Sequence, residues 1–173
     1  MIWEGMITEG LAVARAIHDR YNAVLRNPYN EIECSDHYAR AMASYGAFIA
    51  ACGYKYHGPK GYLAFAPRIN PQNFKAAFTT AQGWGSFSQK ISKQSQTQQI
   101  ELKHGTLKLS KMEFELGTGI RPGDVIAELN GQAVQIRRRI EDRKLLILFR
   151  KPVILARGDN LSIKISAEGQ QKL

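Results

Sequence analysis

The sequence predicts an α-then-β protein, in which helices are followed by an antiparallel β unit. Apolar residues recur at three- and four-residue steps from about Ile2 to Leu25. After Ser86 the period changes to two, because apolar and polar residues alternate. Asn130-Gly131 lies between two apolar runs, and this dipeptide favours a two-residue hairpin turn. We therefore expect a helical segment at 1–85 and a β-rich segment at 86–173.

The first expected helix, from about residue 2 to 25, is amphipathic. Charged residues such as Glu4 and Arg15 lie outside its apolar stripe. The stripe consists of Trp3, Ile7, Leu11, Ala14, Ile17, Tyr21 and Leu25.

The second expected helix, from about Ser35 to Cys52, differs because it carries no charge after Arg40. A helix that is apolar all round must be surrounded by other protein or by lipid, and its length and small residues favour protein. The first helix alone cannot cover it. Gly53 is expected to end the helix as a left-handed cap.

The segment from Tyr54 to Pro67 is rich in glycine, proline and aromatic residues. It fits two alternatives, a substrate-facing loop with rings that stack on sugar, or a packed connection into the β unit. Phe74 to Phe78 is expected to form a short helical turn.

Alternating residues predict the strands of the β unit. A second hairpin is expected to turn through residues 141–144. The whole unit is expected to be sandwich-like or a layer packed on the helices. The expected strands are 100–103, 107–109, 112–116, 125–129, 132–136, 136–140, 145–149 and 161–165.

Composition limits the location and the cysteine chemistry. The 173 residues contain no run of eighteen apolar residues, and the first residues carry two glutamates and no basic stretch. This indicates a cytoplasmic protein without a transmembrane segment or signal peptide, unless Met1 is an internal residue of a longer chain. Cys34 and Cys52 have no metal-binding spacing, and we expect buried thiols.

A turn-rich stretch, 27–42, carries the candidate site. Ser35 or Asp36 can cap the following helix, which places Glu31 just before the helix and Arg40 in its first turns. A carboxylate beside a guanidinium is suited to gripping sugar hydroxyls. The alternative is an exposed Asp36–Arg40 ion pair beside solvated carboxylates at Glu31 and Glu33.

The residues from Trp3 to Trp84 resemble the end of the catalytic domain of glycoside hydrolase family 116, the β-glucosidase and non-lysosomal glucosylceramidase family. This resemblance implies that 1–85 forms the last helices of an (α/α)6 barrel and that Glu31 and Arg40 line the glucose subsite. Glu33 and His37 are possible lesser contacts. The matching stretches are Asp19-Arg20-Tyr21, Arg26-Asn27-Pro28-Tyr29-Asn30-Glu31-Ile32-Glu33-Cys34, Asp36-His37-Tyr38-Ala39-Arg40-Ala41-Met42-Ala43-Ser44, Gly58-Pro59-Lys60-Gly61 and Phe65-Ala66-Pro67.

The resemblance also implies an activity that this chain does not complete. Enzymes of the family hydrolyse β-glucosides with retention, which needs two catalytic carboxyls about 5 Å apart. Both belong to earlier motifs that have no counterpart here. We therefore expect a C-terminal fragment that is inactive alone, whose partners are a β-glucoside or glucosylceramide-type substrate and the missing N-terminal part of the enzyme. No cofactor is expected, and no metal ligand in this chain.

Charge is unevenly divided and supports an alternative. Residues 1–58 carry a net charge of −1 and residues 59–173 a net charge of +10. The alternative is a non-catalytic basic β module that binds carbohydrate, nucleic acid or an anionic surface. Because the charges alternate with Ile and Leu as on a solvated sheet face, we do not expect nucleic acid as the partner. A stand-alone carbohydrate-binding or structural protein is a further alternative.

Overall fold

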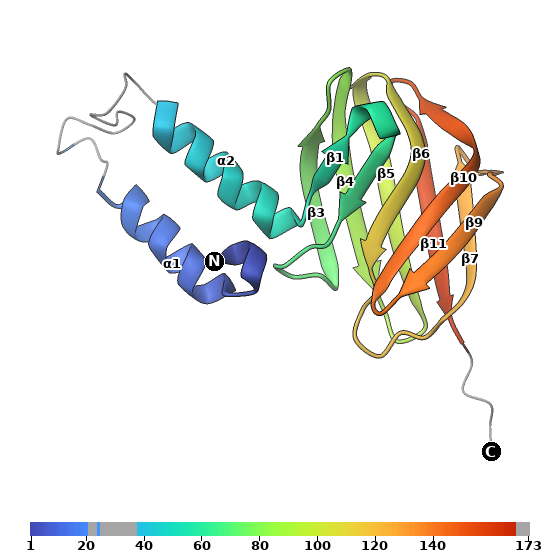
Figure 1. Ribbon diagram of the computed structural model, residues 1–173, viewed down its shortest axis with the longest axis horizontal. Coiled ribbons are helices and arrows are strands. Elements are labelled where there is room, and N and C mark those ends of the chain that lie inside the picture. The colour runs from blue at the N-terminus through green and yellow to red at the C-terminus, as the bar shows by residue number, and fades with distance from the viewer. Residues whose placement is uncertain (21–23, 25–37, 169–173) are drawn as a thin grey trace.

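The computed structural model describes residues 1–20, 24 and 38–168, without the side chains of 38–41. Its described part consists of two β-sheets packed face to face, with a pair of helices beside them (Figure 1). The two helices lie next to one another on one side of the sheets. No helix in this part of the chain is long and apolar enough to cross a membrane.

The first sheet has five strands in the order β1-β2-β6-β10-β9, and the second has six in the order β3-β4-β5-β11-β7-β8. All pairs are antiparallel except the parallel pair β2 and β6. The bounds are β1 Lys55–His57, β2 Tyr62–Phe65, β3 Asn73–Thr79, β4 Gly83–Ile91, β5 Ser95–Gly105, β6 Leu107–Glu115, β7 Pro122–Leu129, β8 Gln132–Ala133, β9 Ile136–Glu141, β10 Lys144–Leu155 and β11 Asn160–Ala167.

Two hairpins turn where the sequence predicts. Leu129 pairs with Gln132, and Asn130 and Gly131 both have positive φ angles, 52° and 79°, as a type I′ turn requires. The second hairpin joins β9 to β10, with Glu141 opposite Lys144. The final strand, β11, contains the predicted 161–165 segment.

The core lies between the sheets and contains inward side chains from both. Phe65 of β2 stacks on Phe87 of β4, with ring centroids 3.9 Å apart and planes inclined by 2°. Phe114 of β6, the partner of Phe65 in the first sheet, has its ring centroid 6.1 Å from that of Phe87. Because these rings come from different sheets, the stack joins the two layers.

The first helix is shorter than the periodicity predicted. A 3-10 turn, η1 (Ile2–Glu4), precedes α1 (Ile7–His18), and Gly5 separates them with a φ of 85°. The second helix, α2, covers Tyr38–Cys52 and is followed by Gly53 at a φ of 57°, so the predicted left-handed cap is confirmed. The predicted start of α2, at Ser35, and the predicted end of the first helix, at Leu25, lie outside the described residues.

The expected fold class, the last helices of an (α/α)6 barrel followed by an antiparallel β tail, is wrong. The described residues form two α-helices and two sheets, and the strands begin at Lys55, far ahead of Ser86. The aromatic segment after Gly53, expected to be a substrate-facing loop or a packed connection, contains a strand instead, in which Leu63, Ala64 and Phe65 are buried. The expected boundary between 85 and 86 lies within β4.

The helical turn expected at Phe74–Phe78 is also wrong, because these residues belong to β3. Spacing of four residues between two aromatic side chains fits a helix face, but it also fits alternate positions of a strand. Here Phe74, Ala76 and Phe78 point to one face and the intervening side chains are exposed.

Candidate functional site

The residues that the sequence singled out precede or begin α2. Glu31, Glu33 and His37 lie outside the described residues. Arg40 lies in the first turn of α2, and its side chain is outside the described part as well. Their grouping into a sugar subsite therefore stays a prediction.

The surface of α2 after Arg40 is apolar and exposed. We call Met42, Tyr45 and Phe48 the α2 apolar face; their exposed fractions are 60%, 46% and 41%. Tyr45 and Phe48 are three residues apart and their rings stack, with centroids 6.3 Å apart. The fully buried residues of the described part of this helix lie at its end, Ala50 and Cys52.

The neighbouring helix does not cover this face and is itself exposed. Leu11, Val13 and Ile17 of α1 remain about two-fifths to one-half exposed, at 41%, 48% and 39%. Large exposed apolar patches are uncommon on monomeric proteins and are typical of surfaces that contact another protein or a ligand.

Cys52 is a buried free thiol, as expected for this cysteine, whereas Cys34 lies outside the described residues. Burial raises the pKa of the Cys52 thiol to about 11. It is therefore protonated at neutral pH and unsuited to act as a nucleophile.

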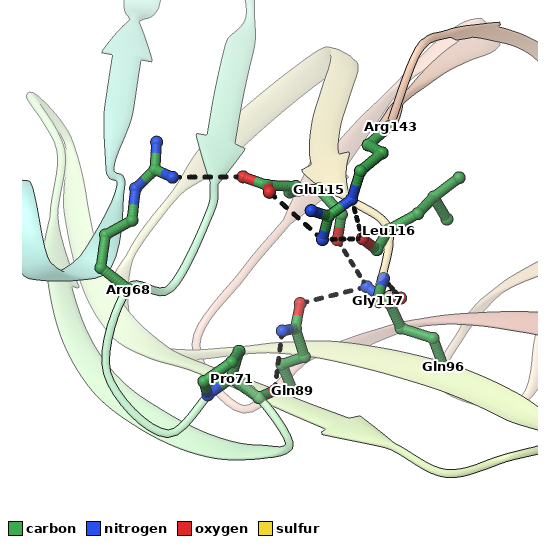
Figure 2. A network of polar contacts seen from close by, with 8 residues as sticks. All are labelled: Arg68, Pro71, Gln89, Gln96, Glu115, Leu116, Gly117 and Arg143. Carbon is green, nitrogen blue, oxygen red and sulfur yellow. Dashed lines mark hydrogen bonds and ion pairs between the residues drawn. The ribbon is translucent and has the colours of Figure 1, made fainter. Parts of the chain in front are cut away.

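A polar network lies at the end of the two sheets, and the sequence patterns did not predict it. Figure 2 shows Glu115, the last residue of β6, between Arg68 and Arg143. Arg68 Nη1 lies 3.5 Å from Glu115 Oε2, and Arg143 Nη2 lies 3.4 Å from Glu115 Oε1. Arg143 also donates to the Leu116 carbonyl from Nε at 3.2 Å and from Nη2 at 2.8 Å.

Buried glutamines from β4 and β5 complete this network. Gln96 donates to the Glu115 carbonyl at 2.8 Å and accepts from the Gly117 N–H at 2.8 Å. Gln89 donates to the Pro71 carbonyl at 2.9 Å and accepts from Gln96 at 3.3 Å. These bonds attach the loops after β2 and β6 to the second sheet (Figure 2).

A cavity of about 460 Å³ opens beside this network. Its walls include Glu115, Arg143, Gln89 and Lys93, the last of which lies in the turn between β4 and β5. Its size lies in the range of small-molecule sites. A second cavity, of about 370 Å³, lies between η1 and the first sheet and also contacts Glu115.

No local pattern would have located the network. Its residues come from positions 68, 89, 96, 115 and 143, and the sheet pairing alone brings them together. One signal was available: Gln89, Gln96 and Gln98 occupy inward positions of alternating strands, where apolar residues are the rule.

No family model matches the sequence, and no curated protein matches it. Among solved structures, the chain is similar to a GH127 β-L-arabinofuranosidase from Geobacillus stearothermophilus T6, with 13% identity and a TM-score of 0.41 over 73% of this chain and 18% of that chain. It is also similar to an α-L-rhamnosidase from Dictyoglomus thermophilum, with 10% identity and a TM-score of 0.42 over 80% of this chain and 16% of that one. Both are glycoside hydrolases, and this chain spans less than a fifth of either.

Proposed function

We propose that this chain is the C-terminal part of a retaining β-glucosidase or glucosylceramidase related to glycoside hydrolase family 116, and that it supplies part of the glucose subsite. The α2 apolar face carries the proposal from the structure, because it needs a covering layer that the described chain lacks. The motif from Asn27 to Met42 carries it from the sequence, since it joins directly onto this helix.

Glu31 is proposed to accept hydrogen bonds from sugar hydroxyls, and Arg40 to donate to them and hold the carboxylate. An ionised Glu31 offers two acceptor oxygens, and a guanidinium offers a planar fork of donors. Glu33 and His37 are lesser candidates for contacts. The catalytic carboxylates, about 5 Å apart in a retaining enzyme, are assigned to the missing part. The chain alone is therefore inactive in this proposal.

The test uses the longest reading frame that contains this chain, expressed and assayed with an aryl β-glucoside. Glu31→Gln and Arg40→Ala should each lower kcat/KM by about tenfold to a hundredfold, the loss expected for a hydrogen bond to a charged group. Circular dichroism should show both variants folded. Glu9→Gln and Arg150→Ala, which change exposed charges elsewhere, serve as controls and should leave kcat/KM unchanged.

Two outcomes would sink the proposal. One is a long form that folds but hydrolyses no β-glucoside. The other is an active long form in which the Glu31 and Arg40 variants have the kinetics of the parent enzyme, because the two residues would then be surface charges. A stop codon and ribosome-binding site directly before Met1 would favour the alternative of a non-catalytic binding protein.

That alternative has an observation of its own. β9 is an edge strand whose Arg137, Arg138 and Arg139 are exposed. Two of these arginines are already engaged: Arg139 lies 2.6 Å from Glu141, and Arg138 donates to the Gly123 carbonyl. Binding to DNA that weakens steeply with added salt would support a basic binding module over the glycosidase fragment.

A further inference from the structure

We propose that the cavity beside Glu115 is a binding site for the oxyanion of a small molecule, a carboxylate or a phosphate. The site is formed where the ends of β4 and β6 approach the turn between β9 and β10. The proposal does not depend on the glycosidase assignment.

The charge of the site favours an anion. Two cations, Arg143 and Lys93, line the cavity together with a single carboxylate, Glu115, which Arg68 also contacts from outside the cavity. The two arginines share that carboxylate at 3.5 and 3.4 Å, well beyond the 2.7–2.9 Å that is typical of a charge-assisted hydrogen bond. One carboxylate therefore leaves positive charge uncompensated at the cavity wall.

Lys93 supplies a second cation to the cavity wall. It lies in the turn between β4 and β5, and no ion pair or hydrogen bond joins its ammonium group to another described residue. A ligand carboxylate or phosphate in the cavity would give it a partner.

Arg143 is held in place before any ligand arrives. Its Nε and Nη2 donate to the Leu116 carbonyl, so the plane of the guanidinium is fixed at the cavity wall. Its Nη1 has no hydrogen-bond partner in the described part of the chain. A donor that is already oriented loses little entropy on binding, which favours affinity for an anion.

The full 173-residue chain, labelled with nitrogen-15, is titrated with glucuronate, with inorganic phosphate and with neutral glucose. We expect at least one anion to bind with a Kd of about 1 mM and to shift the amides of Gly117 and Lys93. Lys93→Gln should weaken this binding about tenfold without unfolding, because Lys93 makes no structural contact. Arg143→Gln should weaken it similarly, and circular dichroism checks that this variant still folds.

Lys164→Gln is the matched control, since Lys164 is an exposed cation on β11 outside the cavity. Glucuronate binding alone identifies a carboxylated sugar as the ligand class, and phosphate binding alone identifies a phosphorylated one. The proposal fails if neither anion gives saturable shifts at these amides. It also fails if glucose binds as well as the anions, or if Lys164→Gln weakens binding as much as Lys93→Gln.

Discussion

Asp159 connects two turns that are distant in the sequence. Its Oδ2 accepts from the Ala156 N–H at 2.7 Å, and its Oδ1 accepts from the Asn130 side chain at 2.8 Å. Asn130 in turn accepts from the Asn160 N–H at 2.9 Å. A single carboxylate thus ties the β7–β8 hairpin to the β10–β11 turn.

These hydrogen bonds predict how stability depends on pH. The bond from Ala156, and then that from Asn130, hold the pKa of Asp159 below its usual range. A carboxyl with a lowered folded pKa stabilises the fold above its unfolded pKa of about 4, and this contribution is lost as the pH falls through the folded value. Asp159→Asn should lower the free energy of unfolding at pH 7 by about 1–2 kcal/mol, measured by urea denaturation.

The difference between parent and variant should shrink as the pH falls below about 4. Asp124→Asn is the control, because the Asp124 side chain is exposed and makes no ion pair or side-chain hydrogen bond within the described part of the chain. A difference that is the same at pH 3 and pH 7 would contradict the role of the carboxylate charge.

At the scale of the strand, β9 is the exposed edge of the first sheet. Its Arg137 and Arg139 lie on one face, opposite Leu148 and Leu146 of β10. Charged side chains on an edge strand hinder pairing with another molecule. Replacing both by valine should therefore produce self-association, seen as faster sedimentation at equal concentration.

A second double variant tests the effect of net charge, because it replaces two lysines on central strands. Lys108→Val and Lys164→Val change the net charge by the same amount, but β6 and β11 already pair on both sides. Equal self-association of the two double variants would show that net charge, and not the edge position, keeps the chain apart.

The elements also show which parts of the fold local sequence can predict. The Asn130-Gly131 turn was predictable because its residues favour the positive φ angles that it needs. β3 was not, since the Phe74–Phe78 spacing fits both a helix and a strand. No local sequence pattern predicts the parallel pairing of Tyr62 with Lys111, because it joins segments that are far apart along the chain.

At the scale of the molecule, the stack of Phe65 and Phe87 holds the two sheets together. Phe87 is completely buried and contacts rings of both β2 and β6. Phe87→Ala should lower the free energy of unfolding by about 3–5 kcal/mol, because it leaves a cavity between the layers. Thermal unfolding measures the loss. Phe48→Ala, at an exposed position of α2, should change it by less than about 0.5 kcal/mol.

The two candidate sites differ in whether the sequence alone could predict them. The stretch around Glu31 and Arg40 was found because its residues are neighbours in the chain. The Glu115 network was missed because Arg68 and Arg143 meet it only through the pairing of β2, β6 and β10. The residues of a site that distant strands assemble can be recognised only when the pairing of those strands is known.

Gly46 tests whether α2 is covered in a larger molecule. A Cβ at this position would meet nothing within 4 Å, so in this chain alone Gly46→Ala should stabilise the helix by about 0.5–1 kcal/mol. If another protein layer packs closely on α2, Gly46→Leu should overfill the contact and destabilise the long form by about 1–3 kcal/mol. Thermal unfolding of this chain and of the long form measures the expected gain of stability in the first and the expected loss in the second. A long form that tolerates leucine would show that this face stays open to solvent.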